Sequence, residues 1–106
     1  MQMEIKKILL ELKQGLINLY GDQLVDVLLY GSYARNEQRK DSDIDIAVVL
    51  KGTINPFKEI DRITEFSYDL SLKYSTLLSI HPISELDYIK RSSPFVLNLR
   101  EEGISI

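Results

Sequence analysis

Three aspartates at alternate positions, Asp41, Asp43 and Asp45, stand directly in front of an apolar run at residues 46–50. Successive side chains of a strand point to opposite faces, so Asp43 and Asp45 share one face. Two close carboxylates repel each other and raise each other's pKa unless a cation lies between them. Mg²⁺ typically takes one or two protein carboxylates and completes its shell with water and phosphate oxygens. The pair therefore predicts a magnesium site.

A second feature is the Gly31-Ser32 pair, which ends the apolar run at residues 24–30. Gly31 allows a ligand to approach the backbone closely. Ser32, at the head of a short helical turn, would offer a hydroxyl and free backbone N–H groups, which suit phosphate. Either feature alone also fits an ordinary turn or a solvated strand entry. Their combination on two predicted strands favours a site that holds a magnesium–nucleotide complex.

The segment GSYARNEQRKDSDID, residues 31–45, resembles the nucleotidyltransferase signature of the polymerase-β superfamily, which is Gly-Ser, ten residues, then Asp-x-Asp. The small stand-alone members, called minimal nucleotidyltransferases or MNT proteins, usually carry Gly-Ser-x-Ala-Arg-Gly, a short loop and Ser-Asp-x-Asp. Asn36 stands where glycine is usual, and Asn tolerates left-handed backbone better than most residues. The matching positions are Gly31, Ser32, Ala34, Arg35, Ser42, Asp43 and Asp45.

The resemblance implies a polymerase-β-like nucleotidyltransferase fold, with a small mixed sheet and helices packed on it. It implies that Asp43 and Asp45 are the catalytic pair and bind Mg²⁺ together with a nucleoside triphosphate. Gly31 and Ser32 would contact the β and γ phosphates, and Arg35 would bind the nucleotide as well. A hydroxyl would attack the α-phosphate and pyrophosphate would leave, which most simply moves AMP from ATP.

The resemblance also implies a partner protein. Related small proteins are paired with HEPN-domain proteins in toxin–antitoxin systems, where the nucleotidyltransferase neutralises its partner, in some cases by adenylylating a tyrosine. An antitoxin role with a HEPN-type partner is therefore expected, and the chain would form a homo- or hetero-oligomer.

One departure from the family pattern leaves two alternatives, an active enzyme and a catalytically impaired domain. Active members usually have a third carboxylate on the next strand, but residues 76–83, TLLSIHPI, hold no acid. Ser79 is expected at the equivalent place, with His81 on the same face. His81 could act as a base, or it could be structural. The alternative function is a catalytically impaired module that binds nucleotide or partner and neutralises a toxin by complex formation.

For the other charged residues, the sequence predicts a role less specifically. Asp61, Glu65 and Asp69 could supply an acid, but their positions on a predicted helix favour its solvent face. Asp41 is expected in a loop. Arg39 and Lys40 either neutralise phosphate or lie on a loop surface.

Hydrophobic periodicity places these residues on strands that alternate with helices, which indicates an α/β or α+β layer. Asn55-Pro56 and Ser84 are predicted helix starts. Phe57 is expected on the packed side of its helix, and Ser32–Arg35 are expected to form one helical turn. Helices are predicted at 3–20, 56–75, 84–91 and 93–103, and strands at 24–31, 43–50 and 76–83.

Composition limits the class of protein. The chain has 106 residues, which suits a single domain spanning 1–106. A net charge of −3 gives no sign of dedicated nucleic-acid binding. The absence of cysteine fits a cytoplasmic protein. No apolar stretch approaches the length needed to span a membrane.

Overall fold

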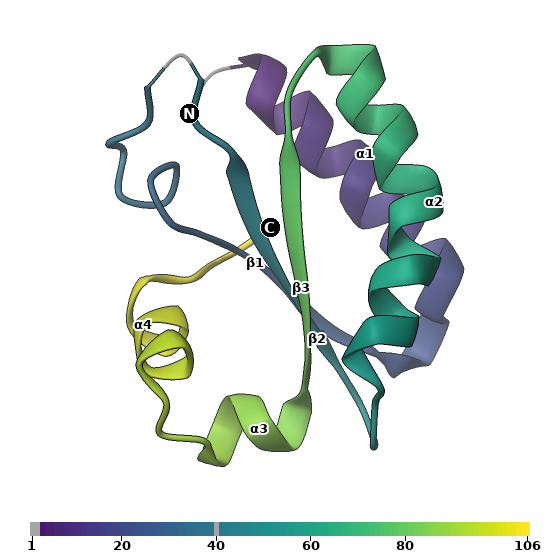
Figure 1. The fold of residues 1–106 in the computed structure, drawn as a ribbon, viewed down its shortest axis with the longest axis vertical. Coiled ribbons are helices and arrows are strands. Elements are labelled where there is room, and N and C mark those ends of the chain that lie inside the picture. Colours follow the sequence, from purple (N-terminus) through teal and green to yellow (C-terminus); the bar gives the residue numbers. More distant parts are fainter. Residues whose placement is uncertain (1–2, 40) are drawn as a thin grey trace.

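The computed structural model describes residues 3–39 and 41–106. Four strands form one sheet, and helices cover both of its faces (Figure 1). A short 3-10 helix at Gly21–Gln23 follows the first helix. The elements are α1 (Met3–Tyr20), β1 (Leu24–Tyr30), β2 (Ile44–Leu50), α2 (Pro56–Tyr74), β3 (Leu78–Ser84), α3 (Glu85–Lys90), α4 (Pro94–Glu102) and β4 (Ile104–Ser105).

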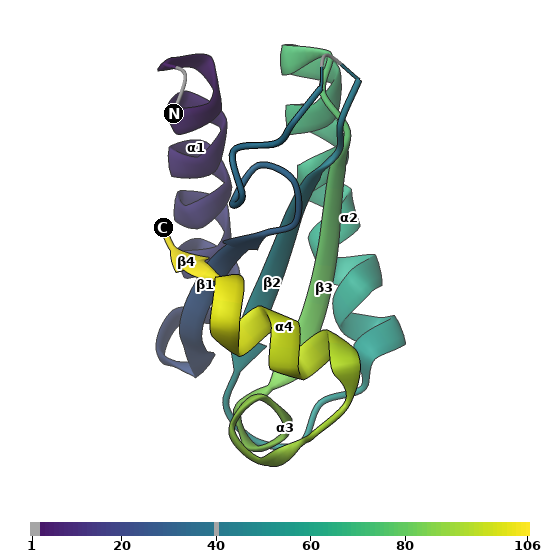
Figure 2. The ribbon, with the colours of Figure 1, turned by 90° about the vertical axis from the view of Figure 1, so that its left-hand side faces the viewer.

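The sheet is mixed, with the strand order β3-β2-β1-β4. β1 pairs antiparallel with β2 and with β4, whereas β2 pairs parallel with β3. The parallel pair needs a crossover, and α2 provides it. Figure 2 shows α4 lying across the strands on one side of the sheet, while α1 and α2 lie on the other. The predicted fold class is confirmed.

The alternation of β2 explains the two apolar clusters. Ile44, Ile46 and Val48 point to the α1–α2 side, where they join the larger cluster with side chains of both helices. Ala47 and Val49 point to the opposite side and pack with residues of β1, β3 and α4. Asp45 points to the same side as Ala47 and Val49, because side chains alternate along a strand. The sheet therefore presents Asp45 on the face that α4 covers.

Local signals at the helix starts are confirmed. The Asn55 side chain accepts hydrogen bonds from the backbone N–H groups of Phe57 and Lys58, and Pro56 is the first residue of α2. Ser84 accepts from the Asp87 N–H at the start of α3. No helix within residues 3–39 and 41–106 is long and apolar enough to cross a membrane.

Three expectations are corrected. Residues 31–36 form hydrogen-bonded turns and no helix, and the strand predicted at 76–83 begins two residues later at Leu78. Phe57 is 80% exposed, because α2 instead packs through Ile63 and its neighbours one turn further on. The two-residue strand β4 was not predicted at all, since such a short segment has no measurable periodicity.

Candidate active site

The Gly31 backbone and the Asp45 carboxylate lie directly against each other. Tyr30 is the antiparallel partner of Asp45, so the next residue, Gly31, comes beside the same carboxylate. Gly31 has a φ of 74°, and a Cβ built on it would overlap Asp45 Oδ2. Only glycine fits here, for both its conformation and its lack of a side chain. The end of β1 and the start of β2 thus form one corner.

Asp43 and Asp45 lie together at that corner. Asp43 immediately precedes β2 and is exposed, whereas Asp45 is half-buried within the strand. Burial and the negative charge of Asp43 both raise the pKa of Asp45, and the nearby His81 and Arg35 only partly oppose them. Neither aspartate forms an ion pair with any other residue that the structure describes. The corner therefore carries uncompensated negative charge, which favours a bound cation.

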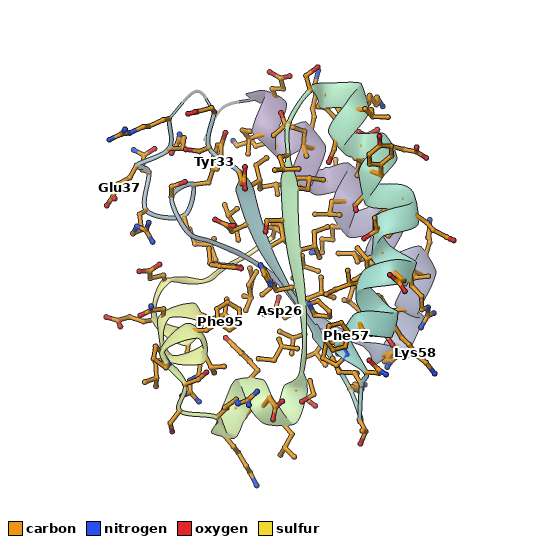
Figure 3. All side chains as sticks on the ribbon, in the orientation of Figure 1. Asp26, Tyr33, Glu37, Phe57, Lys58 and Phe95 are labelled. Carbon is orange, nitrogen blue, oxygen red and sulfur yellow. The ribbon has the colours of Figure 1, made fainter. Side chains whose placement is uncertain are left out.

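The turn after β1 holds the other predicted nucleotide-binding residues. The Arg35 N–H donates to Gly31 O over 3.1 Å and the Glu37 N–H donates to Ser32 O over 2.8 Å. Asn36 has a φ of 57°, so it does adopt the left-handed conformation in which glycine is usual. Ser32 is half-buried at the start of this turn. Figure 3 shows Glu37 pointing outward from the turn.

Arg35 is directed toward α4 in this structure. Its Nη1 lies 3.1 Å from Glu102 Oε2, and its Nε lies 3.5 Å from Glu37 Oε2. The hydrogen bond to Glu102 is the main cause of the raised pKa of Arg35. Arg35 therefore links the turn to the C-terminal end of α4 by an ion pair. A phosphate that bound this guanidinium would compete with Glu102.

Ser79 occupies the place opposite Asp45 on β3, as the sequence predicted. Its Oγ lies 3.3 Å from His81 Nε2, and His81 follows on the same face. The His81 ring packs against Tyr30 and Phe95, with ring centroids 6.1 and 5.8 Å apart. Sequence reasoning missed Tyr30 and Phe95. Strand alternation from Asp45 could have indicated Tyr30, but Phe95 comes from α4 through tertiary packing alone.

No third acid joins the pair among residues 3–39 and 41–106, where no group of three His, Asp or Glu side chains is placed to hold a metal ion. Asp61, Glu65 and Asp69 are exposed on α2, which packs on the other face of the sheet. Asp41 is exposed in the loop before β2, as expected. Lys40 lies outside the described residues.

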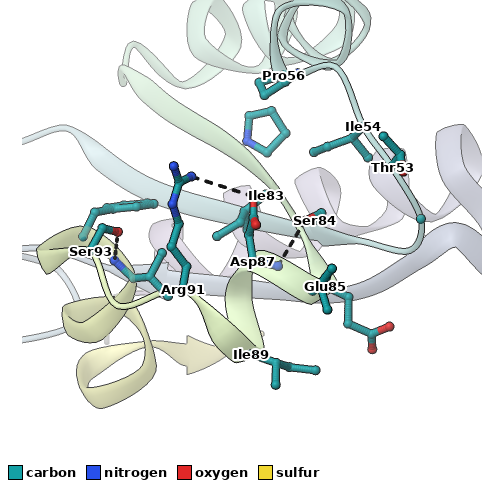
Figure 4. A pocket seen from close by; sticks show the side chains of 15 residues that line it. Thr53, Ile54, Pro56, Ile83, Ser84, Glu85, Asp87, Ile89, Arg91 and Ser93 are labelled. Atoms are coloured by element: carbon teal, nitrogen blue, oxygen red, sulfur yellow. Dashed lines mark hydrogen bonds and ion pairs between the residues drawn. The ribbon is translucent and has the colours of Figure 1, made fainter.

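A pocket of about 690 Å³ adjoins this face of the sheet (Figure 4). It lies between α3, the start of α4 and the connection from β2 to α2. Its walls are largely apolar, and Ser84, Asp87 and Arg91 supply polar atoms. Phe95 lines the pocket and also contacts His81, but the pocket lies beyond the C-terminal end of β2, whereas Asp43 and Asp45 stand at its start.

Comparison with known proteins assigns the family. The sequence profile described as "Polymerase beta, Nucleotidyltransferase" matches residues 4–98. The chain belongs to this nucleotidyltransferase family. It is 34% identical over 104 residues to MJ0141 of Methanocaldococcus jannaschii, which is named as a protein adenylyltransferase, with 98% of this chain and 100% of that protein covered. MJ0604 of the same organism carries the same description and is 30% identical over 95% of this chain and 96% of its own length.

Solved structures show the same fold. A protein of Sulfolobus solfataricus named as a nucleotidyltransferase superposes with a TM-score of 0.64 at 19% identity, over 96% of this chain and 80% of that one. A chain of a toxin–antitoxin structure with AMP-PNP superposes with a TM-score of 0.61 at 18% identity, over 98% of this chain and 72% of that one. Together with the full-length relatives, these neighbours support a minimal, MNT-type nucleotidyltransferase, as the sequence motif predicted.

Proposed function

We propose that this protein is a magnesium-dependent adenylyltransferase that moves AMP from ATP onto a hydroxyl of a partner protein. The target that we infer is a tyrosine of a HEPN-type toxin, which would make this chain the antitoxin. Two full-length relatives named as protein adenylyltransferases and a structural neighbour from a toxin–antitoxin complex support this proposal.

The observation that carries the proposal is the contact between the Gly31 backbone and the Asp45 carboxylate. Any side chain at position 31 would displace the Asp45 carboxylate from the corner. The glycine lets that carboxylate lie against the backbone at the start of the turn, where Ser32 follows. Nucleotide phosphates and acidic side chains repel each other, so a site that combines them needs a cation.

The residues present fit Mg²⁺. Asp43 and Asp45 supply hard oxygen donors, and burial together with the negative charge of Asp43 raises the pKa of Asp45. Bound there, the metal would stabilise the negative charge that develops on the phosphate during transfer. The protein's own contribution is to hold both carboxylates at the corner, next to the Gly31 backbone and the turn that begins at Ser32.

A second function is favoured by one specific observation. The strand position opposite Asp45 is Ser79, where active members of the family usually have a third carboxylate. A serine hydroxyl binds a metal ion weakly and does not accept a proton readily at neutral pH. If Ser79 and His81 do not compensate, the domain binds nucleotide or its partner without turnover and neutralises the toxin by complex formation.

Transfer of radiolabel from α-³²P-ATP to a co-purified HEPN-type partner separates these two functions. The wild-type chain is expected to label the partner, and mass spectrometry should locate AMP on a tyrosine. Asp45→Asn should abolish labelling. Asp41→Asn is the matched control, because this aspartate lies in the exposed loop only four residues earlier and should label normally.

Titration of magnesium–ATP by calorimetry completes the test. Binding without transfer to the partner would establish the second function. Absence of ATP binding, with equal behaviour of Asp41→Asn and Asp45→Asn in every assay, would refute transfer, and failure to form a complex with the partner as well would refute the second function.

A further inference from the structure

The outer side of α2 carries apolar side chains that nothing covers in the described chain. Phe57, Ile60, Tyr68 and Leu72 are 80%, 38%, 60% and 63% exposed. Phe57 and Ile60 are three positions apart and Tyr68 and Leu72 are four, so each pair is adjacent on the helix surface. The two pairs, about two turns apart, are called the stripe. Leu77, 61% exposed just before β3, lies at its C-terminal end. Exposed apolar side chains grouped in this way are typical of interaction sites in soluble proteins.

A groove of about 430 Å³ runs along this stripe, between α2 and the start of β3. Its walls include Thr64, Tyr68 and Ser71 from the helix, and Leu77 and Leu78 from the strand side. None of the residues that line it is charged. Together, the stripe and the groove are called the α2–β3 surface. Figure 1 shows that it lies on the outer right of the molecule, away from the turn after β1.

Acidic side chains border the α2–β3 surface. Asp61, Glu65 and Asp69 follow one another at intervals of four residues and are all exposed. None of the three forms an ion pair with another residue that the structure describes. Two cations of α2 are turned toward α1 instead, since Arg62 pairs with Glu59 and contacts the Tyr20 ring, while Lys73 pairs with Glu11.

The charge distribution indicates which kind of binding partner fits the α2–β3 surface. An apolar stripe beside a row of unpaired carboxylates is complementary to an apolar face flanked by lysine or arginine. A second copy of this chain would bring two acidic rows close to each other, which is unfavourable. Addition of a strand to the edge of β3 is also unfavourable, because Pro82 within that strand lacks a backbone N–H group.

We propose that the α2–β3 surface docks an amphipathic helix of a protein partner, with large apolar side chains facing the groove and basic residues facing Asp61, Glu65 and Asp69. Such a helix would lie alongside α2 and bury side chains at i, i+3, i+4 and i+7 spacing. This surface belongs to the opposite helical layer from the Asp45 corner. One end of the surface approaches the corner, because Leu77 O accepts a hydrogen bond from the Ile44 N–H. The proposal does not depend on adenylyl transfer.

The test uses two fluorescent peptides, each about five helical turns long. Both carry the same leucine face; lysines flank it in one peptide and glutamates flank it in the other. Fluorescence anisotropy should show binding of the lysine peptide, with affinity falling as salt is added. Leu72→Ser should weaken that binding by about tenfold or more, since it removes a large buried side chain from the contact.

Two further variants make the test specific. Leu86→Ser is the matched control, because Leu86 is 60% exposed, close to the exposure of Leu72, but lies on α3. It should leave binding unchanged. The triple change Asp61→Lys, Glu65→Lys, Asp69→Lys should reverse the preference, so that the glutamate peptide binds better. Circular dichroism of each variant should match wild type, because every changed side chain is exposed.

Several results would overturn the proposal. Equal affinity for the two peptides, no binding of the lysine peptide, or an equal effect of Leu86→Ser would each contradict it. Sedimentation that shows a dimer which Leu72→Ser dissociates would assign the surface to a second copy of this chain instead.

Discussion

The two faces of the sheet differ in whether their buried or half-buried carboxylates have hydrogen-bond or ion-pair partners. Under α1 and α2, thirteen buried apolar residues form one cluster, and the buried Glu59 is bound by the Tyr20 hydroxyl at 2.7 Å and by Arg62 at 3.1 Å. Under α4 the buried cluster has six residues. Asp45, at the end of this face, has a raised pKa and no ion-pair partner among the described residues.

This difference distinguishes a polar group that stabilises the fold from one that marks a functional site. A buried polar group that stabilises a fold is satisfied by its neighbours, as Glu59 is. A half-buried carboxylate held next to another carboxylate costs stability, and such groups mark functional sites. The first face therefore supports the fold, whereas the second carries a carboxylate without an ion-pair partner among the described residues.

The largest expected effect is on transfer by Asp45→Asn. We expect a loss of about a thousandfold, since a metal-binding carboxylate contributes several kcal/mol to stabilisation of the transition state. The same Asp45→Asn variant should be more stable to unfolding than wild type. Because the folded-state pKa of Asp45 is raised, its ionised form is disfavoured in the fold, and its removal should raise the melting temperature in metal-free buffer at pH 7. A lower melting temperature would show that Asp45 is structural, like Glu59.

Next in size is a pair of cavity-forming changes, one on each face. Leu12→Ala, in the larger cluster, should cost about 3 kcal/mol of unfolding free energy in urea titration. Leu99→Ala, in the smaller cluster, should cost less, because α4 can settle onto the sheet more easily than α1 can. Equal costs would show that the two faces are equally rigid.

A smaller effect is expected for Tyr20→Phe, which removes the hydroxyl that binds Glu59. The cost at neutral pH should be about 1 kcal/mol of unfolding free energy. Burial and Glu59 raise the pKa of Tyr20 above its ordinary value of 10.0. The neutral phenol is thus favoured in the fold, so wild-type stability is retained below pH 10 and falls as the pH rises above it. Tyr20→Phe should reduce this alkaline loss.

The smallest effect is expected for Glu102→Gln, which frees Arg35 from its ion pair on the α4 side. Because an exposed ion pair is weak, calorimetry should show ATP binding about two- to threefold tighter. Glu85→Gln, a half-buried glutamate on α3, is the control and should change nothing. Weaker binding by Glu102→Gln would mean that the ion pair positions Arg35 for the nucleotide.

Local signals in the sequence predicted much of the fold. The bounds of α1 agree at both ends, and Asn55-Pro56 correctly begins α2, because apolar periodicity and helix caps act over a few residues. The same holds for the corner of the site. Its Gly-Ser pair and alternate aspartates are close in sequence, whereas the register that pairs Ser79 with Asp45 comes from the structure.

Contacts between distant segments were not predictable in the same way. The Arg35–Glu102 pair joins residues 67 positions apart, and the Tyr20–Glu59 hydrogen bond joins residues 39 apart. Nothing near Glu59 in the sequence indicates that it is buried. Phe57 satisfies the apolar pattern of α2, but α2 has several apolar stripes, and only packing decides which one faces the sheet.

The pairing of β4 with β1 has a consequence for how the protein is made. Leu28 and Leu29 pair with Ser105 and Ile104, so one border of the sheet stays open until residues 104–105 have left the ribosome. Loop closure over such a separation is slow, and an unpaired strand border invites pairing with another nascent chain. Ribosomes that stall shortly before residue 104 should therefore release a product that aggregates, even though the helices and strands of the larger cluster are already synthesised.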